Sequence, residues 1–183
     1  MLKKESTGLI VVDIQGRLTR LVHDSDALVS NCEKLIKGVQ ALELPILWLE
    51  QNPEKIGETV EELSTLLSSP TNHQEPIIKY TFDGCENAQF IDAVKDTNVD
   101  TWIVCGIEAH ICVYQTALSL KHMGFKVQIV SDCVSSRELA NKTLAINKLV
   151  NNGVELTGLE MCLFELVKDC RTPVFKEILT LIK

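Results

Sequence analysis

Short continuous apolar runs alternate along the chain with longer segments in which apolar residues recur at helical spacing. The runs predict strands at Gly8–Asp13, Pro45–Leu49, Pro76–Tyr80, Thr101–Cys105, Lys126–Val130 and Val154–Leu156. The periodic segments predict helices at Asp26–Leu42, Ile56–Leu67, Asn87–Lys95, His110–Met123, Ser136–Asn151, Leu159–Val167 and Pro173–Ile182. Because the strands show no alternation with polar residues, we expect both faces of the sheet to be covered.

This order of elements predicts one α/β domain over residues 1–183, with a parallel sheet between two helical layers. No internal repeat or linker indicates a domain boundary. In such sheets ligands bind beyond the carboxyl ends of the strands, where the strand order reverses. The polar residues and the cysteine expected at those ends are Asp13, Gln15, Glu50, Lys79, Cys112 and Asp132.

Composition and charge narrow the class of protein. The chain has 183 residues, of which 23% are charged, and its net charge is −7. Since it also lacks a cluster of Lys and Arg, we expect no nucleic-acid partner. The apolar runs are too short to cross a membrane, and residues 1–7 lack the apolar core of a secretory signal. We therefore expect a cytoplasmic protein whose partner is a small molecule.

The seven cysteines are odd in number, irregularly spaced and without a C-x-x-C pair. This pattern argues against a disulfide framework and predicts that six of the seven are buried apolar residues. The histidines at 23, 73 and 122 show no metal-ligand spacing and are expected at the surface, and no nucleotide-binding or zinc-protease motif occurs. We therefore expect no cofactor and no metal.

Cys112 is the exception among the cysteines, because it lies in the first turn of the helix that follows a predicted strand. Unpaired N–H groups at such a position favour the thiolate, which predicts a lowered pKa. The same N–H groups can bind an oxyanion. The alternative is a cysteine that only packs. His110 is not expected to act as its base, because residues two apart on a helix face different directions.

Asp13 and Lys79 each end a predicted strand. Partial desolvation raises the pKa of a carboxylate at that edge, which makes Asp13 a possible proton acceptor for a thiol. Lys79 could hold a thiolate and a carboxylate together. The alternatives are an aspartate that caps a loop and a lysine whose charged end reaches solvent.

Together these residues resemble a known family. Val11-Val-Asp-Ile-Gln15, Lys79 within Ile-Ile-Lys-Tyr, and Cys105-Gly-Ile-Glu-Ala-His-Ile-Cys112-Val are similar to motifs of the isochorismatase-like cysteine hydrolases, in the same order and at similar separations. Val130–Ser136 is similar to a further family segment. Thr157–Glu177 resembles the branch that contains animal isochorismatase domain-containing proteins.

The resemblance implies a Rossmann-like three-layer sandwich whose six parallel strands have the order 3-2-1-4-5-6. It also implies a catalytic triad of Asp13, Lys79 and Cys112, in which Asp13 takes the thiol proton and Cys112 attacks a carbonyl carbon. A cis peptide bond between Ile107 and Glu108 is implied as well. It would direct the backbone N–H groups of Glu108 and Cys112 into one oxyanion hole.

Two departures from the family restrict the substrate. Nicotinamidases of the family bind zinc through an aspartate and histidines after the second strand, whereas residues 48–54 here read Trp-Leu-Glu-Gln-Asn-Pro-Glu. Members that cleave isochorismate commonly lack the cysteine, so Cys112 argues against that substrate. What remains is a metal-independent hydrolase of a small amide, imide or related carbonyl compound. Further substrate contacts are predicted from Gln15, Leu18, Gln51, Asn52 and Tyr80.

Two other functions stay open from the sequence. One is a non-catalytic relative that acts as an oligomeric binding or scaffold protein. The other is a thiol-redox protein in which Cys112 pairs with Cys105 or Cys133. We also expect a homo-oligomer, because the resemblance points to one and because apolar residues are abundant over Leu163–Val167 and Val174–Leu179.

Overall fold

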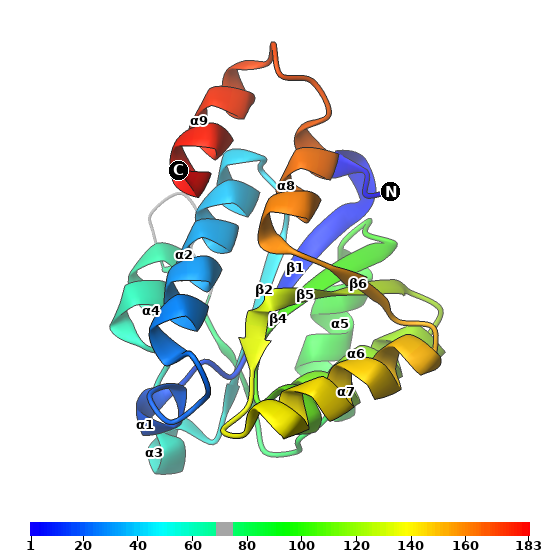
Figure 1. Cartoon of the computed structure of the whole chain (residues 1–183). Coiled ribbons are helices and arrows are strands. Elements are labelled where there is room, and N and C mark those ends of the chain that lie inside the picture. The colour runs from blue at the N-terminus through cyan, green and yellow to red at the C-terminus, as the bar shows by residue number, and fades with distance from the viewer. Residues whose placement is uncertain (69–74) are drawn as a thin grey trace.

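Six parallel strands form one sheet in the order β3-β2-β1-β4-β5-β6 (Figure 1). The structure is a computed structural model in which residues 1–68 and 75–183 are described. The strands are β1 (Thr7–Val12), β2 (Ile46–Gln51), β3 (Ile77–Lys79), β4 (Thr101–Ile107), β5 (Lys126–Ser135) and β6 (Glu155–Thr157). The predicted strand order is confirmed, and it reverses between β1 and β4.

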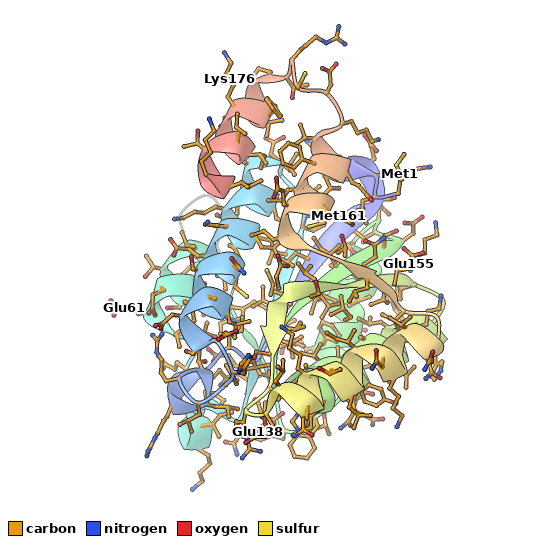
Figure 2. All side chains as sticks on the ribbon, viewed as in Figure 1. Met1, Glu61, Glu138, Glu155, Met161 and Lys176 are labelled. Atoms are coloured by element: carbon orange, nitrogen blue, oxygen red, sulfur yellow. The ribbon has the colours of Figure 1, made fainter. Side chains whose placement is uncertain are left out.

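Helices cover both faces of the sheet. They are α1 (Gly16–Thr19), α2 (Ser25–Ala41), α3 (Pro53–Ile56), α4 (Glu61–Leu67), α5 (Ala88–Asp96), α6 (Tyr114–His122), α7 (Leu139–Asn151), α8 (Leu159–Val167) and α9 (Pro173–Ile182). Helices α2, α4, α8 and α9 share one apolar core with the sheet, and α5, α6 and α7 share the other. Figure 2 shows side chains filling the space between these layers. The predicted three-layer sandwich is confirmed.

The strands explain the continuous apolar runs. In β1, Leu9 and Val11 belong to the core under α2, whereas Ile10 and Val12 belong to the core under α6. All four side chains are fully buried. Burial of each such side chain stabilises the fold by about 1.5–3 kcal/mol. A strand with two covered faces therefore shows a continuous apolar run, and the single polar side chain of β1, Thr7, lies at its start.

Gly106 allows β4 to run close beside β1. Its φ is +134°, and a Cβ atom there would lie 2.0 Å from the carbonyl oxygen of Val12. Only glycine fits a backbone this close in that conformation. The peptide bond between Ile107 and Glu108 is cis, as the family resemblance implied.

Several element boundaries differ from the prediction. The helix expected over Ile56–Leu67 begins only at Glu61, as α4, and Ile56 instead ends α3, because Gly57 has φ +90° and Thr59 forms an isolated bridge with Gln15. Strand β5 continues to Ser135, and α7 accordingly begins at Leu139 rather than at Ser136. A π-helical turn, Ala109–Val113, precedes α6. Pro70 and His73 lie outside the described residues.

The C-terminal helices use their apolar residues within the chain. Leu163, Leu166 and Ile178 are buried in the core under α2. The rings of Phe164 and Phe175 meet edge to face, with centroids 6.0 Å apart. These residues therefore give no support to the predicted oligomer. Over residues 1–68 and 75–183, the longest apolar helices are too short or too polar to span a membrane.

Candidate active site

The carboxyl ends of β1 and β3 bring Asp13 and Lys79 together. Strand β2 lies between them, with Val12 paired to Leu49 and Gln51 paired to Lys79. Asp13 follows β1 with φ 51°, a left-handed conformation that aspartate adopts more readily than most residues. The Lys79 Nζ atom lies 2.7 Å from the Asp13 Oδ2 atom. The two residues thus form an ion pair.

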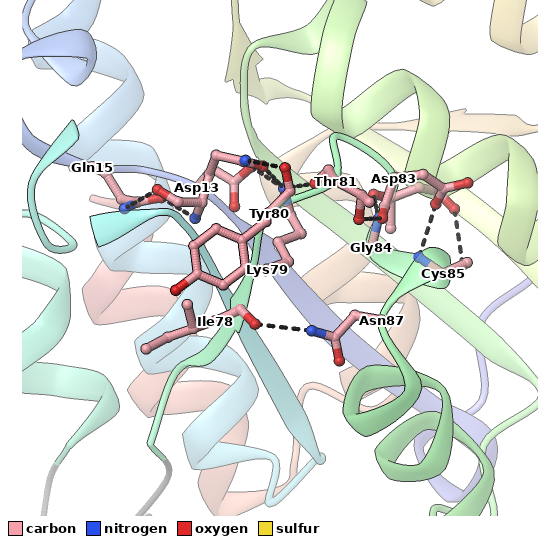
Figure 3. Close-up of polar contacts among 12 residues, drawn as sticks. Asp13, Gln15, Ile78, Lys79, Tyr80, Thr81, Asp83, Gly84, Cys85 and Asn87 are labelled. Atoms are coloured by element: carbon pink, nitrogen blue, oxygen red, sulfur yellow. Dashed lines mark hydrogen bonds and ion pairs between the residues drawn. The ribbon is translucent and has the colours of Figure 1, made fainter. Parts of the chain in front are cut away.

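Lys79 is fully buried and all three of its N–H donors have acceptors (Figure 3). The ammonium donates to Asp13 Oδ2 and to Gln51 Oε1 at 2.7 Å each, and to the carbonyl oxygen of Thr81 at 3.3 Å. The interpretation that its charged end reaches solvent is therefore wrong. A buried ammonium needs such partners, because desolvation without them is costly.

Asp13 is 2% exposed, and only one of its oxygens accepts a hydrogen bond from the described residues. Its Oδ1 atom accepts none. Burial raises the pKa of this carboxyl, whereas the Lys79 ammonium opposes that shift and Glu50 adds to it. Asp13 is therefore a stronger base than an exposed aspartate, and it has an oxygen free to take a proton.

Cys112 lies in the turn before α6, close enough to Asp13 and Lys79 for both to affect its ionisation. Burial raises the pKa of the thiol to about 12; the Asp13 carboxylate adds to the shift, and the Lys79 ammonium opposes it. The predicted lowering of this pKa is therefore wrong, because burial and a neighbouring negative charge outweigh the helix start. The resting group is a neutral thiol beside a carboxylate.

The five residues predicted as further substrate contacts have different surroundings. Gln15 is fully buried: its amide nitrogen donates to the carbonyl oxygens of Gln51 and Gly57, and its oxygen accepts from the Gln51 N–H. A substrate contact would break this network. Gln51 bonds Lys79 and the carbonyl oxygen of Tyr80. Tyr80 is 71% exposed, Asn52 is half-buried, and Leu18 packs against the core under α2.

Glu108 has a partner that the sequence did not indicate. Its side chain is 5% exposed, and its Oε1 atom accepts from the backbone N–H of Arg137 at 3.1 Å and from the Arg137 Nε atom at 3.0 Å. His110 bonds Ser136 through its Nδ1 atom at 2.9 Å. Both contacts fasten the turn that carries Cys112 to the segment after β5. The similarity of residues 130–136 to a family segment was the only signal pointing there.

The cysteines proposed as redox partners lie on the other side of the sheet from Cys112. Cys105 and Cys133 belong to the core under α2 together with Cys32, whereas Cys112 belongs to the core under α6. The sheet separates the two groups. The thiol-redox alternative is therefore not supported by the arrangement of the thiols.

Access to the three residues is narrow. Cys112 is 8% exposed and is the most accessible of the three. A hollow of about 730 Å³ beside α1 and α4 is lined by Gly16, Arg20 and Glu62 among others, but not by Asp13, Lys79 or Cys112. Among the described residues, no group of three or more His, Cys, Asp or Glu side chains is arranged to hold a metal ion.

The sequence over residues 7–161 matches the family model described as the isochorismatase domain. The chain belongs to the isochorismatase family. A relative from Phytophthora sojae, described as the secreted isochorismatase effector Isc1, is 30% identical over 97% of this chain and 85% of its own length.

Solved structures agree with this assignment. A Caenorhabditis elegans protein described as MAR1 ribonuclease is 30% identical, has a TM-score of 0.89, and matches over 99% of this chain and 91% of its own. YcaC from Pseudomonas aeruginosa, solved with hexane-2,5-diol and covalent acrylamide, is 26% identical with a TM-score of 0.90, over 98% and 90%. The Escherichia coli YcaC product, described as an octameric hydrolase, is 24% identical with a TM-score of 0.91, over 98% and 89%.

Proposed function

We propose that this protein is a metal-independent cysteine hydrolase that cleaves a small amide, imide or related carbonyl compound through a covalent Cys112 adduct. The observation that carries the proposal is the buried Asp13–Lys79 ion pair, in which Asp13 Oδ1 accepts no hydrogen bond from the described residues, with the Cys112 thiol close enough for thiol and carboxyl to affect each other's ionisation. A carboxylate of this kind can take the thiol proton at the moment of attack.

In the first half-reaction the proton of Cys112 passes to Asp13 and the sulfur forms a bond to the carbonyl carbon. The electron pair of the C=O bond moves to its oxygen, which the backbone N–H groups of Glu108 and Cys112 are proposed to bind. Lys79 stabilises the negative charge as it moves from the carboxylate to the sulfur. The C–N bond then breaks, and Asp13 returns its proton to the leaving nitrogen.

Water completes the cycle. Asp13 takes a proton from a water molecule, whose oxygen attacks the thioester carbon. Breakage of the C–S bond releases the acid, and Cys112 regains its proton from Asp13. Each turnover therefore consumes one water molecule and leaves all three side chains as they began.

The charges at this edge of the sheet support an uncharged substrate. Asp13 is paired with Lys79, and Glu108 is paired with Arg137, whereas the buried Glu50 accepts hydrogen bonds from Thr59, so neither cation of these pairs is free to bind an anionic substrate. A second ion brought against the buried Asp13–Lys79 pair would have to be desolvated without a new partner, which is costly. A small neutral amide or imide carries no such cost.

Alkylation followed by peptide mass spectrometry tests the nucleophile. Acrylamide and iodoacetamide are suitable reagents, and Cys170, which is exposed, provides an internal reference in the same sample. We expect Cys112 to be alkylated faster than Cys170 near pH 7, and Cys112→Ser to remove that adduct while leaving the rate at Cys170 unchanged. Related YcaC from Pseudomonas aeruginosa was solved with covalent acrylamide, which supports the choice of reagent.

A panel of neutral amides and imides then tests catalysis, with the acyl adduct on Cys112 detected by intact mass. Turnover that Cys112→Ser abolishes supports the proposal. If Cys112 reacts no faster than the buried Cys162 and no compound acylates it, the chain is better described as a non-catalytic binding protein.

A ribonuclease function is not adopted, although one structural relative is described as a ribonuclease. The net charge of this chain is −7, whereas RNA binding needs a basic surface. Cleavage of a labelled RNA that is lost in Cys112→Ser would contradict this choice.

The oligomer and the cytoplasmic location remain part of the proposal. Tyr80 and Phe82 are exposed apolar residues at and beyond the end of edge strand β3, where a second copy could pack. The octameric description of the Escherichia coli relative is consistent with a homo-oligomer. Light scattering at micromolar concentration tests it, and a monomer would reject it.

A further inference from the structure

The loop after β3 is attached to helix α6 by two side chains of that helix. The backbone N–H of Gly84 donates to the Thr116 Oγ1 atom at 2.8 Å. The Ser119 hydroxyl donates to the Asp83 Oδ2 atom at 2.5 Å. The other oxygen of Asp83 accepts from the Cys85 N–H, which closes a tight turn within the loop (Figure 3).

The same loop reaches the candidate active site at its other end. The carbonyl oxygen of Thr81 accepts from the Lys79 ammonium, and the Thr81 hydroxyl donates to the carbonyl oxygen of Asp83. The loop therefore connects Lys79 to helix α6 through a short series of hydrogen bonds. A shift of Gly84 away from α6 would be transmitted to the acceptor of Lys79.

Thr116 lies four residues after Cys112, one helical turn along the chain. Both side chains are buried, and Thr116 is fully so. A threonine has few χ1 rotamers, so its hydroxyl is held in a defined direction. The segment that carries the candidate nucleophile thus also carries the acceptor that fixes the lysine loop.

We propose that Thr116 is a positioning residue that, by holding Gly84, sets the placement of the Lys79 ammonium relative to the Cys112 sulfur. This inference rests on the proposed function. It assigns Thr116 no contact with substrate. Lys79 keeps Asp13 and Gln51 as partners when the Thr116 bond is lost, so the ammonium stays in the site but loses a fixed position.

The packing at Gly84 allows the hydrogen bond to be removed without removing the contact. A Cβ atom built on Gly84 would lie 3.1 Å from the Thr116 Cγ2 atom and 3.0 Å from the Leu49 Cδ1 atom, so the loop backbone lies directly against both side chains. Thr116→Val keeps the methyl group and takes away only the acceptor. Thr116→Ser keeps the acceptor and takes away the methyl group.

The experiment measures the separate rates at which iodoacetamide alkylates Cys112 and Cys170 in the full chain between pH 5 and 9, and the ratio of the two rates at pH 7.5. Urea denaturation first establishes that every variant is folded under these conditions. We expect Thr116→Val to lower the ratio at pH 7.5 by about tenfold, because small misplacements of reacting groups are that costly. Thr116→Ser should stay within about twofold of the wild type. Thr180→Val is the matched control, because the exposed Thr180 hydroxyl bonds a carbonyl of its own helix, α9.

The pH profile separates positioning from mere stability. A thiol that shares its proton with Asp13 reacts at a rate independent of pH between the two pKa values, since the thiol–carboxylate and thiolate–acid forms carry the same protons. Thr116→Val should lower this plateau, because a misplaced ammonium stabilises the thiolate–acid form less, so that the rate of the unassisted thiolate, which rises tenfold per pH unit, overtakes it at a lower pH. Ser119→Ala should change the profile in the same direction by a smaller factor.

The possible results are distinct. If the wild type lacks a fast-reacting Cys112, the proposed function fails. If the wild type shows it and Thr116→Val keeps both the ratio and the plateau while unfolding at lower urea concentration, Thr116 is structural only and the inference is overturned.

Discussion

The Asp13 carboxylate and the Lys79 ammonium are 2.7 Å apart and both are buried, although 66 residues separate them in the chain. Removal of one member leaves the other charged and unpaired in the interior. We expect Lys79→Met to lower the free energy of unfolding at pH 7 by about 3–5 kcal/mol. Urea denaturation followed by circular dichroism measures this change.

The double variant Asp13→Asn/Lys79→Met tests whether the loss comes from the unpaired charge. Replacing both members of a buried ion pair is far less costly than replacing one. The double variant should therefore be more stable than Lys79→Met alone. If the two single effects simply add, the pair does not interact in the way that the contact distance indicates.

Asp13→Asn tests the proton acceptor independently of any substrate. Asparagine keeps the size of the side chain but cannot take the thiol proton. We expect alkylation of Cys112 at pH 7 to slow by about a hundredfold, which is the lower part of the usual range for general base catalysis. The rate should also lose its plateau and rise with pH as thiolate forms. Asp92→Asn, at an exposed position on α5, is the control. An unchanged profile in Asp13→Asn would rule out proton sharing.

The sequence predicted the fold well because the central strands β1 and β4 are buried on both faces throughout their length. That burial leaves continuous apolar runs, such as Leu9–Val12, which locate the strands without any knowledge of their partners. The parallel arrangement then brings the strand ends to one edge, which is why Asp13 and Lys79 could be selected. The strand order itself came from the family resemblance.

Other features of the site left no pattern in the sequence. The bond between Gly84 and Thr116 joins residues 32 positions apart, and neither residue type indicates the other. The Glu108–Arg137 pair was also not predictable, because a single basic residue after a strand forms no recurring pattern in the sequence. The pKa of Cys112 was predicted in the wrong direction, since its position at a helix start is visible in the sequence and its depth of burial is not.

The raised pKa of Asp13 predicts how stability depends on pH. The pKa is raised above 3.8, so at a pH between 3.8 and the raised value the folded protein binds a proton that the unfolded chain does not. The stability from this group is therefore fully present below pH 3.8 and is lost as the pH rises through the folded-state pKa.

Comparison with Asp13→Asn isolates this effect. As the pH falls from 7 to 4, the wild type should gain stability relative to the variant. Glu62 and Asp100, whose pKa values are lowered, have the opposite effect in both proteins and cancel in the difference. The urea midpoints of the wild type and of Asp13→Asn at four pH values measure this difference in stability. If the wild type instead loses stability relative to Asp13→Asn as the pH falls, the Lys79 ammonium outweighs burial in setting the pKa of Asp13.

The Gly106→Ala variant tests whether the backbone beneath the site tolerates a side chain. Its φ of +134° and the 2.0 Å approach of a Cβ atom to the Val12 carbonyl oxygen leave no room for alanine. Gly106→Ala must therefore push β4 away from β1, directly before the turn that carries Cys112. We expect the free energy of unfolding to fall by more than about 3 kcal/mol. That figure is the upper end of the usual cost of backbone strain, and steric overlap adds to it.

Gly124→Ala is the matched control, because Gly124 has φ +97° and nothing lies within 4 Å of its Cβ position. Gly124→Ala introduces backbone strain without steric overlap, so its free energy of unfolding should fall by only about 1–3 kcal/mol. Urea denaturation of both variants gives the comparison. Equal losses would show that strain alone accounts for Gly106, and that β4 can shift enough to admit a methyl group beside Val12.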